Sequence, residues 1–179
     1  MVRHSALFVN RRDSAAQNSV HLGPGEGASD GHGAMDTERN KAIVERYYGE
    51  LNRGNLSVIE ELLRADYVAH DPNLPAEQRE GVDNVILAVE RSRAAMPDQR
   101  IELDDVIAER DLVAFRIKLY GRLEDVGDTL DDGREISITG MGMLRIAGAQ
   151  IAEGWFNFDH YSLLQQLGAL PADTRAPDA

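Results

Sequence analysis

Hydrophobic residues in the first half of the chain recur at helical spacing. Over Thr37–Asn52 apolar side chains return at every third or fourth position, and Gly54 follows as a stop signal. A shorter helix is predicted in NLSVIEELL, residues 55–63. A third helix is predicted over Val82–Met96, which Pro97 closes. The pattern therefore predicts three N-terminal helices.

The segment between the second and third helices carries no such period. The second helix is expected to run into Tyr67–His70, and the string DPNLP, residues 71–75, follows it. Each proline restricts its own backbone and that of the residue before it, which forces an irregular loop. Strands are expected only after Pro97.

After Pro97 the hydrophobic period changes from about 3.6 residues to 2. In LVAFRIKLYG, for example, Val113, Phe115 and Ile117 alternate with side chains that point the other way. The predicted strands cover residues 101–109, 112–121, 135–146 and 150–159, and a short helix, YSLLQQLG, follows. Three helices followed by four antiparallel strands predict an α+β domain in which the helices cover one face of a curved sheet.

Both ends of the chain lack a hydrophobic period. Residues 1–35 are Gly-rich and carry three basic and three acidic residues, so we expect a disordered N-terminal arm. Met35 lies directly before the first periodic segment and is a candidate translation start. The Pro-rich residues 171–179 are expected to form a flexible C-terminal tail, which leaves one domain over residues 36–170.

Composition narrows the class of protein. The 179 residues include 42% hydrophobic residues and no cysteine, which excludes disulfides, thiol nucleophiles and thiolate metal sites and is compatible with a cytoplasmic location. The net charge of −12 repels phosphate backbones and anionic lipids, so neither nucleic acid nor a membrane surface is an expected partner. No apolar run approaches the roughly 18 residues of a membrane-spanning helix.

Several strings, in their order along the chain, resemble the SnoaL-like polyketide cyclase family of the nuclear-transport-factor-two-like superfamily. The resemblance covers Asn40 to Gly168. Its pieces are NKAIVERYYGELNRGN, DYVAHDP, GVDNVILAVERSRAAMPD, ITGMGMLRI and IAEGWFNFDHYSLLQQLG. It implies a cone-shaped fold in which helices lie across a strongly bent sheet and enclose an apolar pocket open at one end.

The resemblance also implies site residues. Alternation along the final strand places Trp155, Asn157 and Asp159 on one face, and the resemblance implies that this strand forms part of the pocket wall. The family's acid/base aspartate follows the tryptophan of this strand, and Asp159 is the position that matches it. Further candidates for substrate contact are Tyr47, Met141 and Met143.

A carboxyl group in an apolar pocket suits ring closure by aldol condensation. The reaction removes a proton beside a carbonyl and delivers one to the developing alkoxide, and one carboxyl can serve both steps. Burial brings the pKa of such a group nearer the operating pH. The chemistry requires no metal and no organic cofactor.

The chain departs from the family at one position. Classical members carry a histidine three residues before the arginine of the third predicted strand, where this chain has Gly142. His70 and His160 are the candidates to replace it from another direction. Asp159 also has a structural interpretation, because an aspartate directly before a helix suits an N-cap.

Two functions from different classes follow. The first is a cofactor-independent enzyme that acts on a hydrophobic, carbonyl-bearing small molecule by ring closure or proton transfer. The second is a non-catalytic small-molecule-binding domain. Epoxide hydrolysis ranks last, because the strands lack an Arg-x-Asp string. An uncovered antiparallel sheet would expose apolar residues, so we also expect a homodimer formed through the outer face of the sheet.

Overall fold

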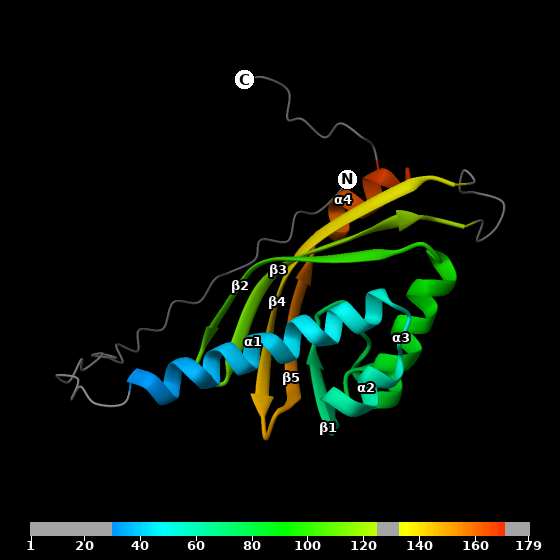
Figure 1. Cartoon of the computed structure of the whole chain (residues 1–179). Helices are drawn as coiled ribbons and strands as arrows, with labels where there is room; N and C mark the ends of the chain where they lie inside the picture. The colour runs from blue at the N-terminus through cyan, green and yellow to red at the C-terminus, as the bar shows by residue number, and fades with distance from the viewer. Residues whose placement is uncertain (1–29, 125–132, 171–179) are drawn as a thin grey trace, which may run out of the picture.

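The helices and strands of this chain form two layers, a five-stranded sheet and the helices of residues 30–95 across its concave face, whereas the short C-terminal helix lies apart from these helices, beside the end of the sheet (Figure 1). The computed structural model describes residues 30–124 and 133–170. The helices are α1 Asp30–Asn52, α2 Ser57–Leu62, the 3-10 turn η1 Ala76–Gln78, α3 Val82–Ala95 and α4 His160–Gln166. The strands are β1 Leu63–His70, β2 Arg100–Glu109, β3 Leu112–Arg122, β4 Glu135–Ala147 and β5 Gln150–Phe158.

The sheet is mixed and has the strand order β1-β5-β4-β3-β2. Strands β2 to β5 pair antiparallel, whereas β1 pairs parallel with β5. The predicted α+β fold, with helices on one face of a curved and mainly antiparallel sheet, is confirmed. Within the described residues, no helix is long and apolar enough to cross a membrane.

Strand β1 was not predicted. Its eight residues begin where the apolar run of α2 ends, and alternate burial is clear only from Tyr67 to His70. The strand is completed by parallel pairing with β5, for example Ala69 with Gly154 and His70 with Trp155. A partner more than 80 residues away leaves no local period in the sequence, which is why the run resembled a helix end.

The N-terminal boundary of the domain differs from the predicted one. Helix α1 begins at Asp30, seven residues before the predicted Thr37, so the predicted N-terminal arm overlaps it over residues 30–35. Extending an existing helix costs little once its first turn has formed. The rest of the predicted arm, residues 1–29, and the predicted tail, residues 171–179, lie outside the described residues, as does most of the predicted loop between β3 and β4.

Irregular positions within the strands accompany the bend of the sheet. The β2–β3 register shifts between Asp104 and Ile107, and Asp105 adopts a positive φ of 49°. An extra residue of this kind bends a strand and increases its twist. The long strands curve around α1, which lies across the concave face (Figure 1). The interior that results lies between this face and the helices.

Apolar residues of α1, α2 and the inner sheet face form the core. Val44, Val58, Ile59 and Val113 are fully buried, and Phe115 is nearly so. Burying each such side chain contributes about 1.5–3 kcal/mol.

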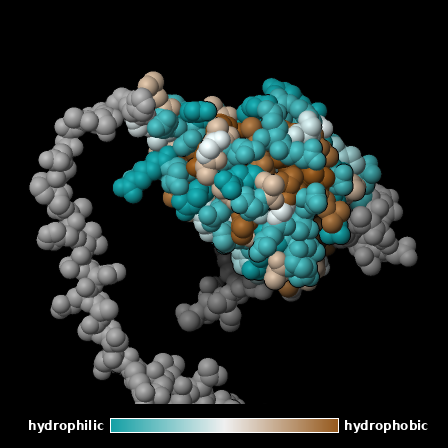
Figure 2. Space-filling view, turned by 90° about the horizontal axis from the view of Figure 1, so that it is seen from below, coloured by the Kyte–Doolittle hydropathy of each residue, from teal (hydrophilic) through white to brown (hydrophobic). Residues whose placement is uncertain are grey.

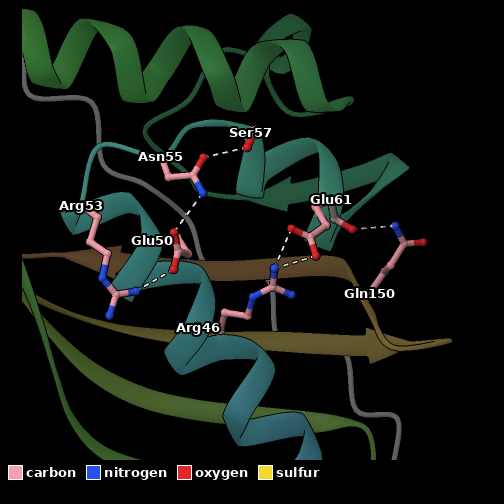
Figure 3. Close-up of polar contacts among 7 residues, drawn as sticks. All are labelled: Arg46, Glu50, Arg53, Asn55, Ser57, Glu61 and Gln150. Atoms are coloured by element: carbon pink, nitrogen blue, oxygen red, sulfur yellow. Dashed lines mark hydrogen bonds and ion pairs between the residues drawn. The ribbon is translucent and has the colours of Figure 1, made fainter.

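A polar network ties the end of α1 to α2 and to the β4–β5 turn (Figure 3). The Arg46 guanidinium contacts both carboxylate oxygens of Glu61 at 2.6 Å. Asn55 donates to Glu50 at 2.9 Å, and Gln150 donates to the Glu61 carbonyl at 3.2 Å. These contacts are solvent-exposed, so they fix the direction of α2 more than they add to stability.

Candidate functional site

A cavity of about 290 Å³ lies between the helices and the inner face of the sheet. Small-molecule sites begin at about 300 Å³, so this volume suits a compact ligand. Apolar side chains from every strand and from α1 and α3 form most of its wall, among them Leu51, Val85, Val89, Ile101, Ile117, Leu119, Leu144, Ile151, Phe156 and Phe158. Seen from below, apolar side chains also reach the surface in patches among hydrophilic residues (Figure 2).

Three tyrosines bring hydroxyl groups into this apolar cavity. Tyr47 and Tyr48 come from α1 and Tyr67 from β1, and each is at most 8% exposed. Burial raises the pKa of all three above the usual tyrosine value. Among the described residues, none forms a hydrogen bond with these hydroxyls. They are therefore neutral donors available to a ligand.

Gly154 of β5 makes the room that Tyr67 occupies. A Cβ at this position would collide with the Tyr67 hydroxyl oxygen and would lie 2.9 Å from Leu144 Cδ2. The absence of a side chain at position 154 thus allows the hydroxyl to pack against the β5 backbone. Adding one methyl group there would displace the Tyr67 hydroxyl.

Asp71, directly after β1, is the one carboxylate that lines the cavity within the described residues. Its Oδ1 accepts hydrogen bonds from the backbone N of Asn73 at 2.8 Å and from the Asn73 side chain at 3.0 Å. This local turn, typical of aspartate, fixes one oxygen. The pKa of Tyr67 is raised first by burial, then by Tyr47 and by the charge of Asp71. The charge of Asp71 therefore acts on the Tyr67 phenol, and both residues line the cavity.

A second polar group lies at the other edge of the sheet. Gln99 precedes β2 and is 3% exposed, and Ser92 of α3 donates from its Oγ to Gln99 Oε1 at 2.6 Å. Both line the cavity, as do Gln78 and Asn84. The cavity thus carries polar groups beside the end of β1 and beside the start of β2, as well as the tyrosine hydroxyls, in a wall that is mostly apolar.

Of the residues predicted from the sequence, Tyr47 lines the cavity, and Asp159 does not. Asp159 is the N-cap of α4, and its Oδ1 accepts a hydrogen bond from the backbone N of Ser162 at 2.9 Å. The side chain is exposed. The helix-cap interpretation of Asp159 is confirmed as its structural role.

The predicted alternation along β5 is present, but the expected orientation toward the cavity is wrong. Phe156 and Phe158 line the cavity, so Trp155 and Asn157 between them lie on the outer face of the sheet. Met141 and Met143 pair with Asn157 and Trp155 on that outer face. Aromatic residues occupy both faces of β5, and hydrophobicity alone therefore did not distinguish the inner face from the outer.

His70 also lies on the outer face. Its ring stacks on Trp155 with centroids 4.7 Å apart and planes 11° apart, and its Nε2 lies 3.1 Å from Glu153 Oε2. Arg145 contacts the same Glu153 and lies over the Trp155 ring at 5.5 Å. His70 therefore belongs to an outer surface cluster and is absent from the cavity wall.

Neither predicted replacement for the family's histidine reaches the cavity wall. The ring of His160 packs against Phe158 at the start of α4, and its Nδ1 lies 3.2 Å from the Phe158 carbonyl. At Gly142 itself, a Cβ would lie 2.5 Å from Phe115 Cζ. The Phe115 ring thus fills the space that a side chain at position 142 would need.

The sequence analysis did not identify three of the cavity residues as candidate functional groups, namely Tyr67, Asp71 and Gln99. The string DYVAHDP contains the first two, but it was predicted as a helix end and an irregular loop. Neither of these determines on which side of the chain the side chains lie. Tyr67 and Ala69 are both buried in β1, so period-2 alternation across this short string was the available signal. No local pattern marked Gln99.

The three cavity tyrosines lead to a prediction at high pH. Because their pKa values are raised in the folded state, the corresponding stability is fully present below about pH 10, where unfolded tyrosine ionises, and is lost as the pH rises further. We expect an absorbance titration to show at most two of the five tyrosines ionising before alkaline unfolding. In Tyr47→Phe the number of tyrosines that ionise only when the protein unfolds should fall from three to two. Five independent ionisations would contradict this burial.

Comparisons with known proteins agree with the fold. The family model for SnoaL-like polyketide cyclase matches residues 41–167, and the chain belongs to this family. No curated protein matches the sequence.

Solved structures share the architecture across the domain. IdmH of Streptomyces antibioticus, described as a candidate polyketide cyclase, is 28% identical with a TM-score of 0.63, covering 72% of this chain and 98% of that one. A candidate polyketide cyclase of Acidithiobacillus ferrooxidans is 26% identical with a TM-score of 0.66, covering 73% and 95%. AclR of Streptomyces galilaeus, described as a candidate hydroxylase, is 24% identical with a TM-score of 0.66, covering 75% and 99%, and supports the fold alone.

Proposed function

We propose that this chain is a cofactor-independent enzyme that transfers protons on a hydrophobic, carbonyl-bearing small molecule, with aldol-type ring closure as the reaction class. The observation that carries the proposal is the cavity, whose mostly apolar wall contains, within the described residues, one carboxylate, Asp71, together with buried tyrosine hydroxyls, of which that of Tyr67 is affected by the charge of Asp71. Membership of the SnoaL-like polyketide cyclase family supports the same class of substrate.

The proposed chemistry uses these groups in two roles. The free oxygen of Asp71 takes a proton from the carbon beside the substrate carbonyl, and the carbonyl oxygen becomes an enolate oxygen that accepts a hydrogen bond from a tyrosine hydroxyl. In ring closure the enolate carbon then bonds to a second carbonyl carbon, whose oxygen becomes an alkoxide. The proton held by Asp71 goes to that alkoxide, which restores the carboxylate.

The alternative function is a binding domain with the same cavity and no turnover. Asp71 supports the enzyme, since one of its oxygens is held by the Asn73 backbone and the other accepts no hydrogen bond from a described residue. A carboxylate fixed in this way at a cavity wall is suited to proton transfer, whereas a binding site for apolar molecules has no need of it.

Exchange of carbon-bound protons with solvent tests the two functions without knowledge of the substrate. The probe is 2-tetralone, a compact bicyclic ketone whose protons beside the carbonyl exchange with D₂O at a rate measurable by NMR. We expect the protein to accelerate this exchange and to saturate with increasing ketone. Binding of the ketone without acceleration would instead identify a non-catalytic binding domain.

We also propose that the outer face of the sheet pairs with a second copy. Ile107, Ala114, Met143 and Trp155 form one continuous row across β2, β3, β4 and β5. Ile107 is 65% exposed and Met141, in the neighbouring row, is 63% exposed. An apolar row of this kind across an open sheet favours a symmetric partner that covers it.

Light scattering tests this pairing. We expect about twice the 19.8 kDa chain mass for the unaltered protein and the monomer mass for Met141→Lys, because a charge would be buried at the interface. Leu87→Lys, at an exposed apolar position on α3, is the matched control and should remain dimeric. A monomer in the unaltered protein, or a dimer that tolerates Met141→Lys, would contradict the proposal.

A further inference from the structure

Gln99 is a deeply buried polar side chain at the edge of the cavity opposite Asp71. It precedes β2, whereas Asp71 follows β1, and these strands are the two edges of the sheet. At 3% exposure, Gln99 is the one buried residue with an amide or charged side chain within the described ranges. Burying an amide is costly unless its hydrogen bonds are satisfied. Any amide atom of Gln99 without a partner in the protein therefore indicates a polar group of a ligand.

Neighbouring groups fix both the backbone and the amide of Gln99. The Gln99 backbone N donates to the Met96 carbonyl at 3.0 Å, and Gly121 packs so closely that a Cβ there would lie 3.0 Å from Gln99 Cα. Because Ser92 Oγ donates to Oε1 at 2.6 Å, the amide is oriented with its NH₂ group left over. Among the described residues, none accepts a hydrogen bond from that NH₂ group.

We propose that Gln99, oriented by Ser92, determines specificity by donating a hydrogen bond to a second oxygen of the ligand, remote from the carbonyl near Asp71. The inference rests on the proposed function, in which the cavity holds a hydrophobic ketone. It narrows the substrate class to compact molecules with oxygen at both ends, such as a ketone that carries a distal carbonyl, ether or hydroxyl. An apolar group in the same place leaves the amide NH₂ unpaired, and sites built with buried donors reject such analogues.

A matched pair of ketones isolates this contact. The probes are 6-methoxy-2-tetralone and 6-ethyl-2-tetralone, which have similar shapes and differ in whether the distal substituent contains an acceptor oxygen. We expect calorimetry to show that the methoxy compound binds about five- to tenfold more tightly to the unaltered protein, as for one net hydrogen bond. In Gln99→Leu, which keeps the approximate volume, the two dissociation constants should become equal within about twofold.

Ser92→Ala tests the same contact without altering the amide. Loss of the Oγ donor frees the amide to rotate, so the preference for the methoxy compound should fall but the affinity for the ethyl compound should stay. This variant also tests whether the oriented Gln99 amide causes the methoxy preference if Gln99→Leu does not fold. An equal or ethyl-favouring affinity in the unaltered protein, or a methoxy preference that persists in a folded variant of Gln99 or in Ser92→Ala, would overturn the inference.

The test of Gln99, which measures ligand preference, can fail or succeed independently of the test of the proposed function, which measures proton exchange. Acceleration of proton exchange without a methoxy preference would leave the enzyme proposal in place and remove the role of Gln99. A methoxy preference that Gln99→Leu abolishes, without any proton exchange, would support the Gln99 contact in a binding domain that performs no catalysis.

Discussion

We expect Asp71→Asn to lower the rate of protein-catalysed proton exchange on 2-tetralone by about two to four orders of magnitude, the usual contribution of a positioned general base. Asparagine keeps the shape of the side chain and an oxygen that can accept from the Asn73 backbone N, whose present distance is 2.8 Å. The local turn should therefore persist while the proton acceptor is lost. The measurement is the NMR exchange rate at saturating ketone, together with the dissociation constant of the ketone.

The expected signature is a loss of rate with little loss of binding. The dissociation constant should change by less than about threefold, because the apolar wall supplies most of the affinity. Tyr67→Phe should cause a smaller fall in rate, since Tyr47 and Tyr48 leave other donors in the same cavity. If Asp71→Asn exchanges protons as fast as the unaltered protein, the carboxylate has no catalytic role.

Asp159→Asn is the matched control and separates the structural assignment from the one that the family resemblance implies. Asparagine caps helices about as well as aspartate, so both stability and exchange rate should remain unchanged. Asp159→Ala should cost about 1 kcal/mol of unfolding free energy through loss of the bond to the Ser162 backbone N, again without an effect on exchange. If Asp159→Asn alone abolished exchange, the acid/base group would be Asp159.

Restoring the family's histidine should damage the fold. We expect Gly142→His to lower the free energy of unfolding by about 3 kcal/mol, the upper part of the usual range for overpacking a core. The reason is geometric, because a Cβ at this position lies 2.5 Å from Phe115 Cζ and 3.2 Å from Phe156 Cδ1. Phe115 is 2% exposed and has nowhere to move without disturbing Tyr48, whose ring packs edge-on against it.

Ala65→His is the control for this substitution. Ala65 is exposed on the edge strand β1, outside the row proposed to meet a second copy, so the same ring added there should change stability by less than about 0.5 kcal/mol. Chemical denaturation of both variants measures the difference. The double variant Gly142→His/Phe115→Ala removes the Phe115 ring that the histidine would collide with. It should therefore recover part of the stability that Gly142→His loses, because the two side chains compete for the same space. A fully stable Gly142→His would show that the Phe115 ring can leave its place.

The sequence by itself determined the features that depend on neighbouring residues. The helical period predicted Val82–Met96, and the structure places α3 at Val82–Ala95. The change of period after Pro97 predicted β2 to β5 and hence the α+β class. Alternation along β5 separated Trp155 from Phe156, and an aspartate before an apolar run gave the cap of α4 as one of two interpretations of Asp159. Each of these follows from backbone geometry within a few residues.

Only the tertiary structure decided which face of the sheet is the inner one. Alternation divides β5 into two sets of side chains but does not say which set meets the helices, and both sets contain aromatic residues. The helices pack against Phe156 and Phe158, which places Trp155 and Asn157 outside and moves the candidate chemistry away from them.

The candidate site likewise depends on contacts between distant segments. Asp71 reaches the cavity because β1 pairs parallel with β5, and Gln99 reaches it from the opposite edge strand. Gly142 has no side chain because the Phe115 ring of the neighbouring strand β3 fills the space that a side chain would need. Such contacts leave no period in the sequence, because they are set by the packing of strands and helices far apart along the chain and not by the local preferences of either.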